Sequence, residues 1–366
     1  MKAGWHPRIK PEHGLDRATG DRVRVGGAVF GIAAEVVDRT GAVWTMLEAA
    51  DGNRSVTQIV DTVRHKHPDE TPDAVRHALD ALADEGYLED ATATRPDGLS
   101  AREITRYDRG MRFFRWLDLT ARESPWEPQL RLKRSRVVVI GLGGTGGAVA
   151  TALAASGVGW LHCVDGDRVE LSNLNRQVTY RESDVGRSKV DACVERLRQL
   201  NTDISVTGER CAITGEPDLR RLADDHDLLV LCADRPGEIR AWANRACLDS
   251  ATPWVDAGYH GPQITATAYV PGQGACYECN WLSEVEFHRQ THPDRQYSVH
   301  RASVDAATAV SAGLSGYLAA HVAIALITGV GAVEPGTIQG VNLAAVDHHV
   351  LLRNGRHPDC PACGGR

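Results

Sequence analysis

The sequence lacks an excess of basic charge, and this limits the partners that it predicts. It has 41 Lys and Arg residues against 48 Asp and Glu residues, a formal net charge of −7 at pH 7. Proteins that bind nucleic acid or anionic membrane surfaces usually present a positive face to them. We therefore predict that the protein binds neither nucleic acid nor a membrane.

Two kinds of apolar segment are also missing. The first residues, "MKAGWHPRIKPEH", contain no apolar stretch of the kind that a secretory signal needs. Residues 306–333 lack Asp, Glu, Lys and Arg, but Ala, Gly, Ser and Thr dominate them and His321 lies in their middle. This composition favours a buried helix over a membrane span. We predict a cytoplasmic protein.

The nine cysteines are an odd number in a long chain, which argues against a disulfide framework. Four of them form two C-x-x-C pairs, Cys276 with Cys279 and Cys360 with Cys363. Two such pairs can supply four thiolates to one tetrahedral Zn²⁺ with no open coordination position. We predict a structural zinc that staples the C-terminus to the body of the domain. Two unrelated reduced pairs, or one redox pair, are the alternatives.

A chain of 366 residues is long enough for two domains. Residues 1–20 are rich in Pro, Gly and His, and we expect them to be irregular. Residues 21–91 show two apolar stretches followed by helical patterns. Ser55 and Thr71 are good helix N-caps, and Gly86 is a good helix end. We predict a small winged-helix-like domain over residues 21–91.

This N-terminal domain is acidic, because residues 21–90 hold 14 Asp and Glu against 7 Lys and Arg. Winged helices often bind DNA, but such a charge is a poor match for a phosphate backbone. Its pattern, through "GAVWTMLEAADGNRSVTQIVDTV" and "ALDALADEGYLED", resembles the PqqD-like peptide-recognition domain. The resemblance implies that a leader peptide adds as an extra strand to the edge of its sheet.

Residues 92–102, "TATRPDGLSAR", have the composition of a linker, and we predict a larger domain over residues 103–366. Strand and helix patterns alternate there, which is typical of an α/β domain with a doubly wound, largely parallel, Rossmann-like sheet. The predicted elements in order are "SRVVVI", "AVATALAASG", "WLHCVDGD", "SKVDACVERLRQL", "ISVTGERC" and "DLLVLCAD".

A glycine-rich turn follows the first of these strands. Gly141, Gly143 and Gly146 satisfy G-x-G-x-x-G before a helix, and Gly144 lies in the same turn. Glycines let the backbone approach a phosphate, and a helix N-terminus attracts the anion. Asp165, 19 residues after Gly146, is suited to hold a ribose. These features fit an NAD-dependent dehydrogenase as well as an enzyme that uses ATP.

The stretch "DGDRVELSNLNRQ", residues 165–177, favours ATP. A reaction at the α-phosphate must neutralise charge at phosphorus and hold the departing pyrophosphate. Arg176 and Lys189 can supply the cations and Asn173 a donor, and Asp167 lies in the same nucleotide-binding turn. Asp234 ends the strand "DLLVLCAD", where a carboxylate suits Mg²⁺. The alternative is a set of unrelated surface charges at loop ends.

The segments "GLGGTGG", "VDGDRVELSNLNRQ", "VGRSKVDA" and "LCAD", with the two C-x-x-C pairs, resemble the ThiF/MoeB/HesA superfamily of ubiquitin-activating-enzyme-like adenylyltransferases. The resemblance covers roughly residues 103–366. It implies that ATP and a peptide C-terminal carboxylate give an acyl-adenylate and pyrophosphate. By motif it also implies that Asp165 holds the ribose, that Asn173, Arg176 and Lys189 bind phosphates, and that Asp234 is linked to magnesium.

The segment "RYDRGMRFF" resembles the family's RY-x-R-Q segment, which makes Arg109 the implied arginine finger. In the family this residue reaches the partner subunit's site, so the resemblance implies a homodimer. Two departures stand out. Arg235 and Pro236 replace the family's usual residues after "LCAD", and residues 280–305 contain no cysteine. We therefore do not expect a covalent enzyme thioester.

Three functions fit these observations. The first is ATP-dependent adenylation of the C-terminus of a ribosomally made precursor peptide, because the two parts together resemble microcin C-type maturation enzymes. The second is adenylation of a ubiquitin-like sulfur carrier, by enzymes that usually lack the N-terminal domain. The third is a non-catalytic leader-peptide scaffold beside a YcaO-type cyclodehydratase. Such scaffolds tend to lose the ATP residues, which this chain keeps.

Overall fold

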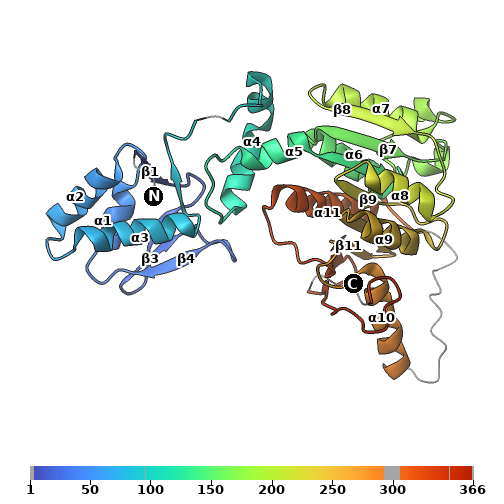
Figure 1. Cartoon of the computed structure of the whole chain (residues 1–366). Helices are drawn as coiled ribbons and strands as arrows, with labels where there is room; N and C mark the ends of the chain where they lie inside the picture. The colour runs from blue at the N-terminus through green and yellow to red at the C-terminus, as the bar shows by residue number, and fades with distance from the viewer. Residues whose placement is uncertain (1–3, 95, 292–305, 346, 365–366) are drawn as a thin grey trace. The chain divides into compact units, whose positions relative to one another are not determined.

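The computed structural model describes residues 4–94, 96–291, 306–345 and 347–364 (Figure 1). The chain divides into two compact units, Met1–Leu130 and Arg131–Arg366. We call them the N-terminal unit and the C-terminal unit. Residues 103–130 belong to the first unit, although the sequence pattern grouped them with the second.

The N-terminal unit contains two small antiparallel sheets. In one, β1 (Pro7–Ile9) pairs with β5 (Leu88–Asp90). The other has the order β2 (Leu15–Ala18), β3 (Arg22–Val25), β4 (Ala34–Val37), so β4 is an edge strand. The expectation that residues 1–20 are irregular is therefore wrong. β1 forms because a distant strand pairs with it, which local composition does not reveal.

Three helices pack against these strands: α1 (Ala42–Ala49), α2 (Val56–Lys66) and α3 (Pro72–Asp84). The predicted caps are present. The Ser55 side chain accepts a hydrogen bond from Gln58 N, and the Thr71 side chain accepts one from Ala74 N. The apolar faces of the helices close one core, whose most buried members include Met46, Ile59, Leu79 and Val25.

A long helix, α4 (Ala101–Leu117), completes the N-terminal unit, and α5 (Glu127–Arg134) spans the division between the units. Ser100 and Glu103 form a capping box at the start of α4. Ile104, Tyr107 and Met111 bury one face of α4 against Trp126.

The C-terminal unit is built on an eight-stranded sheet with the order β13-β12-β11-β10-β9-β6-β7-β8. The prediction of a largely parallel α/β fold is confirmed. The parallel part comprises β6 (Arg136–Ile140), β7 (Trp160–Val164), β8 (Ser205–Glu209), β9 (Leu228–Leu231) and β10 (Trp254–His260). The sequence pattern did not identify the antiparallel extension, β11 (Gln263–Tyr269), β12 (Ile338–Asn342) and β13 (His349–Leu352).

Helices cover both faces of this sheet. They are α6 (Gly144–Ser156), α7 (Lys189–Leu200), α8 (Glu216–Asp224), α9 (Ile239–Ser250) and α11 (Ala309–Thr328), while α10 (Tyr277–Thr291) packs against α9. Val138, Ile140 and Leu229 pack against α8 and α9. Neighbouring strand residues such as Val139 are also fully buried and face the other side. Burial on both faces is what a parallel sheet requires.

The uncharged stretch forms α11, which lies along α6 and contacts β10 and β11 (Figure 1). This confirms the prediction of a helix packed on the domain. α11 is long and apolar enough to cross a membrane by length and composition, but half of that stretch is buried against the unit. Packing of this extent is what a core helix shows.

Strand order reverses at β6, because β7 and β8 extend the sheet on one side and β9 and β10 on the other. Ligands of open α/β sheets bind at such a point, outside the carboxyl ends of the strands. The strand order therefore makes the edge where the chain leaves β6 and β9 the expected ligand site.

Candidate active site

The glycine turn is packed so closely that side chains are excluded at Gly141 and Gly146. Gly141 has a φ of 86°, and a Cβ there would lie 2.7 Å from Ala233 N. A Cβ on Gly146 would lie 1.7 Å from Gly141 O. Gly143 is the N-cap of α6, and a Cβ there would contact Gln177 only, at 3.8 Å. The turn therefore brings the N-terminus of α6 against the end of β9.

Asp165 ties the end of β7 to this turn. One carboxylate oxygen accepts a hydrogen bond from Leu142 N at 2.6 Å, and the other accepts one from Asp167 N at 2.7 Å. Each oxygen has a further lone pair, so the carboxylate can still accept from a hydroxyl group. Asp165 thus lies beside the glycine turn, as a ribose-binding acid must.

Lys189 is the first residue of α7 and is buried. Its Nζ donates to an oxygen of Asp167 at 2.8 Å, while 72% of the Asp167 side chain is exposed. A buried cation whose partner carboxylate is exposed can exchange that carboxylate for another anion. The pair therefore fits a phosphate-binding role for Lys189.

The turn after β7 carries Asn173 and Arg176. The Asn173 side-chain oxygen accepts from Glu170 N at 3.1 Å, which holds a short 3-10 helix (Leu171–Asn173). Arg176 donates to Ser172 O at 2.9 Å. A Cβ on Gly144 would lie 2.9 Å from Arg176 O, so this turn packs directly on the start of α6.

Asp234 follows β9 at the same edge of the sheet. It accepts a hydrogen bond from Arg240 Nη2 at 2.9 Å, and Arg240 Nε donates to Asp256 at 2.9 Å. Burial opposes the charge of Arg240, but the carboxylates of Asp256 and Asp234 outweigh it and raise the pKa. Two carboxylates gathered at one guanidinium offer the oxygen donors that Mg²⁺ prefers.

The predicted nucleotide residues of the C-terminal unit are therefore brought together. The carboxyl edge of β6, β7 and β9 holds the glycine turn, Asp165, the Asn173–Arg176 turn, Lys189 and Asp234. Arg109 lies on an exposed face of α4 in the N-terminal unit.

Three residues of this edge were missed by sequence reasoning. Tyr180 donates to Leu142 O at 2.7 Å, and burial raises its pKa, so it supports the turn as a neutral donor. Gln177 is buried and its Oε1 has no partner among the described atoms. Arg240 joins Asp234 to Asp256. The sequence contains one signal for Arg240, namely that it is a cation on the helix that follows the strand ending at Asp234.

The four paired cysteines form one buried cluster. The sulfur atoms of Cys276, Cys279, Cys360 and Cys363 lie within 4.8 Å of one another, with contacts of 3.3–3.7 Å. A tetrahedral Zn²⁺ with Zn–S bonds of about 2.3 Å requires S···S distances of about 3.8 Å. The cluster therefore fits a metal such as zinc.

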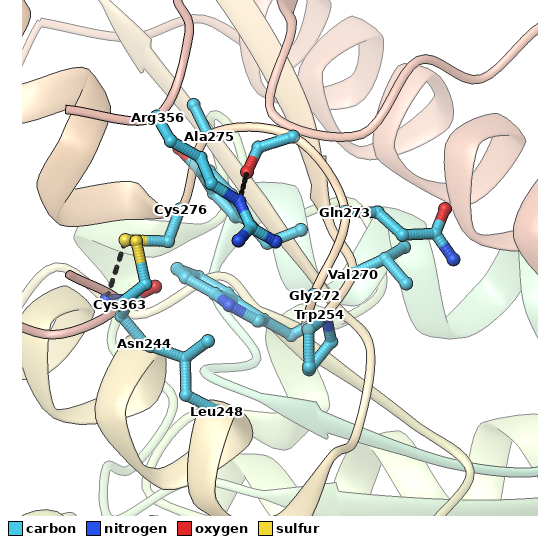
Figure 2. Close-up of a pocket in the computed structure, with 13 residues that line it drawn as sticks. Asn244, Leu248, Trp254, Val270, Gly272, Gln273, Ala275, Cys276, Arg356 and Cys363 are labelled. Carbon is cyan, nitrogen blue, oxygen red and sulfur yellow. Dashed lines mark hydrogen bonds between the residues drawn. The ribbon is translucent and has the colours of Figure 1, made fainter. Parts of the chain in front are cut away.

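Further donors surround this cluster. Asn244 Nδ2 lies 3.5 Å from Cys276 Sγ, and His357 N lies 3.3 Å from Cys279 Sγ. Such contacts orient thiolate ligands. Figure 2 shows a small cavity beside them, between Trp254 and Arg356. At about 20 Å³ it has room for about one water, so it belongs to the packing of the cluster.

The other five cysteines do not have the surroundings of a nucleophile. Cys163, Cys193 and Cys247 are buried. Burial raises the pKa of Cys211 to about 11, and burial followed by the charge of Asp256 raises the pKa of Cys232. Thiols of raised pKa are poor nucleophiles at neutral pH.

Comparison with known proteins agrees with this geometry. Residues 111–362 match the ThiF family. The chain is 32% identical over 240 residues to Escherichia coli sulfur carrier protein ThiS adenylyltransferase, covering 65% of this chain and 89% of that protein. It is 32% identical over 271 residues to the E. coli molybdopterin-synthase adenylyltransferase, covering 73% and 98%.

Its fold matches a crystal structure of E. coli MccB with AMPCPP and MccA, with a TM-score of 0.75. The identity is 24%, and the match covers 98% of this chain and 99% of that one, including the N-terminal unit. On these matches the chain belongs to the ThiF family and is an ATP-dependent adenylyltransferase of that family.

Proposed function

We propose that this enzyme adenylates the C-terminal carboxylate of a precursor peptide that its N-terminal unit captures. One observation carries the proposal: the same chain has both the nucleotide edge, in its C-terminal unit, and a groove, in its N-terminal unit. MccB, whose fold matches both parts, has been crystallised with AMPCPP and MccA together.

The reaction that this site would perform is acyl-adenylate formation. A carboxylate oxygen of the peptide forms a bond to the α-phosphorus of ATP. The bond from that phosphorus to the bridging oxygen breaks, and pyrophosphate leaves with the electron pair. Asp165 would accept from the ribose hydroxyls, and Arg176 and Lys189 would offset the charge that develops on the phosphates.

Three further roles complete the proposed site. The amide group of Asn173 would donate to a phosphate, and Asp167 would release Lys189 to the nucleotide. Asp234 would hold a Mg²⁺ ion, which supplies charge neutralisation when bound. Arg240 fits this role, since it fixes one oxygen of Asp234.

The peptide would bind at the edge strand β4. A groove of about 370 Å³ runs between β4 and helices α1 and α3, lined by Val37, Val43, Met46, Val75 and Ala78, among others. Asp38 N donates to Asp21 O at 2.7 Å, so by antiparallel alternation the Val37 N–H faces away from β3. That edge suits β-augmentation by a leader peptide, and we infer a PqqD-like domain over residues 21–91, with 92–102 as linker.

We also propose a homodimer. Along α11, Val310, Leu314 and Tyr317 are exposed at i, i+4 and i+7 while the opposite face is buried. On α4, Phe113 and Trp116 are exposed at the same spacing from Arg109. Apolar stripes of this kind are typical of interfaces. The occupant would be a second copy, whose Arg109 would reach the phosphates as an arginine finger.

A second candidate is adenylation of a ubiquitin-like sulfur carrier. The relatives with 32% identity favour it, because the name of one specifies the sulfur carrier ThiS. Both candidates share the nucleotide edge and differ in whether β4 and its groove are needed.

A capture experiment separates the two candidates. Val37→Pro removes the outward N–H at the edge of β4, whereas Val37→Thr keeps it. We expect Val37→Pro to weaken precursor binding at least about tenfold by fluorescence anisotropy, with ATP binding unchanged by calorimetry and NAD not bound. If Val37→Pro binds every candidate precursor as tightly as Val37→Thr does, the peptide assignment is wrong and the sulfur carrier becomes the first candidate.

A further inference from the structure

The last turn of α4 is held by residues from the other end of the N-terminal unit. His13 Nε2 donates to Trp116 O at 2.8 Å, and Lys10 Nζ donates to Asp118 O. The final carbonyl groups of a helix have no partner inside the helix, and positive charge is favourable there. Two side chains from the loop after β1 therefore cap α4.

A buried ion pair reinforces this contact. Arg115 donates to Glu12 through Nε at 2.6 Å and through Nη2 at 2.5 Å, and its Nη1 lies 3.4 Å from Glu89 on β5. The Arg115 side chain is 9% exposed, Glu12 15% and Glu89 9%. A bidentate pair between buried partners fixes direction as well as distance.

Backbone packing completes the attachment. A Cβ on Gly86, after α3, would lie 2.4 Å from the carbonyl carbon of Leu119. The Leu119 side chain packs on the apolar core formed by α1, α2 and α3. The helix that carries Arg109 is thus part of the same folded body as β4 and its groove.

From this we propose that Arg115 is a positioning residue: with Glu12 it holds α4 on the N-terminal unit, so that the unit that captures the substrate also sets the position of Arg109. The proposal rests on the function proposed above. Arg109 lies about two helical turns before Trp116, whose carbonyl group accepts the hydrogen bond from His13, and this is about 10 Å along the helix axis. A small rotation of that last turn would move Arg109 away from the phosphates, and a misplacement of about 1 Å can cost about 100-fold in rate.

The test is a double-mutant cycle in the full chain. Arg115→Met should lower kcat of pyrophosphate release about tenfold or more, with the Kd of ATP and of the peptide changed less than about twofold. Glu12→Gln should act in the same direction. Arg112→Met is the matched control, because Arg112 lies on the same helix in an exposed pair with Asp108.

The decisive arm uses an Arg109→Ala background. If Arg115 acts through Arg109, Arg115→Met should cause no further loss of kcat there. Losses that add in full, or a kcat for Arg115→Met equal to that of Arg112→Met, would overturn the proposal. If only a sulfur carrier supports pyrophosphate release, the peptide function fails, and the same cycle is measured with that carrier.

Discussion

Particular ion pairs of the two units bury positive charge in different ways. At the nucleotide edge of the C-terminal unit, two buried cations each have an exposed partner: Lys189 is 8% exposed against 72% for Asp167, and Arg240 9% against 64% for Asp234. In the Arg115–Glu12 pair of the N-terminal unit both side chains are largely buried, at 9% and 15% exposed.

This difference distinguishes a ligand-binding site from a structural contact. An exposed carboxylate can leave its cation when a phosphate arrives, or can accept a metal ion, without unfolding anything around it. A carboxylate that is itself buried cannot do so without leaving a buried charge alone. The C-terminal pairs are therefore suited to bind ligands, and the N-terminal pair is suited to hold a helix.

All four cysteines of the cluster are buried, and replacing one of them should give the largest effect on stability. Cys360→Ser opens a site of four buried sulfur atoms, and structural Zn²⁺ contributes folding free energy directly. We expect loss of about one zinc per chain by metal analysis and a lower Tm by calorimetry. Cys211→Ser is the control, since that thiol lies outside the cluster. A Cys360→Ser protein that is metal-free and as stable as the parent would disprove a structural metal.

Removing an exposed carboxylate from the nucleotide edge should affect turnover next most strongly. Asp234→Ala should reduce pyrophosphate release about 100-fold or more, the range seen when a charge-stabilising group is lost. Precursor binding, measured by anisotropy, should not change. Asp224→Ala removes an exposed carboxylate paired with Arg220 on α8 and should have little effect. Equal activity of the two variants would contradict the role of Asp234.

Removing one cation from each unit should affect stability and ligand binding differently. Arg115→Met leaves the largely buried Glu12 carboxylate without its guanidinium and should lower the free energy of unfolding by about 3 kcal/mol. Lys189→Met leaves Asp167 in water and should cost less than about 1 kcal/mol by loss of the ion pair, while weakening ATP binding. Urea denaturation and calorimetry measure the two quantities. Equal losses of stability would show that the exposure of the partner does not matter.

The smallest expected effect concerns two stacked imidazoles of the C-terminal unit, His162 and His226. The rings of His162 and His226 lie 5.5 Å apart, and burial lowers the pKa of both. Their neutral forms stabilise the fold fully above the unfolded pKa of about 6.5, and this stability is lost as pH falls through the lowered values. His226→Phe should flatten the fall in unfolding free energy below pH 6.5. An unchanged slope would exclude this origin.

Features that depend on neighbouring residues were predictable from the sequence. The glycine turn, the caps at Ser55 and Thr71 and the alternation of strands with helices are of this kind. The placement of Asp165 and Asp234 at one sheet edge also followed, because parallel strands share an edge.

Contacts made by distant parts of the chain were not predictable. Arg115 and Glu12 are separated by 103 positions, and β1 exists because β5 pairs with it. Arg240 was missed because its partner Asp256 lies on β10, one of the strands that local patterns did not identify.

The central claim is that the nucleotide edge activates a carboxylate presented by a peptide. The most direct measurement is pyrophosphate release with ATP, Mg²⁺ and candidate precursor peptides, each prepared with a free and with an amidated C-terminus. We expect one free-acid peptide to give pyrophosphate and a peptide–AMP product by mass spectrometry, and its amide to give neither. Equal release with the amidated form, or release with a ubiquitin-like carrier alone, would contradict the account.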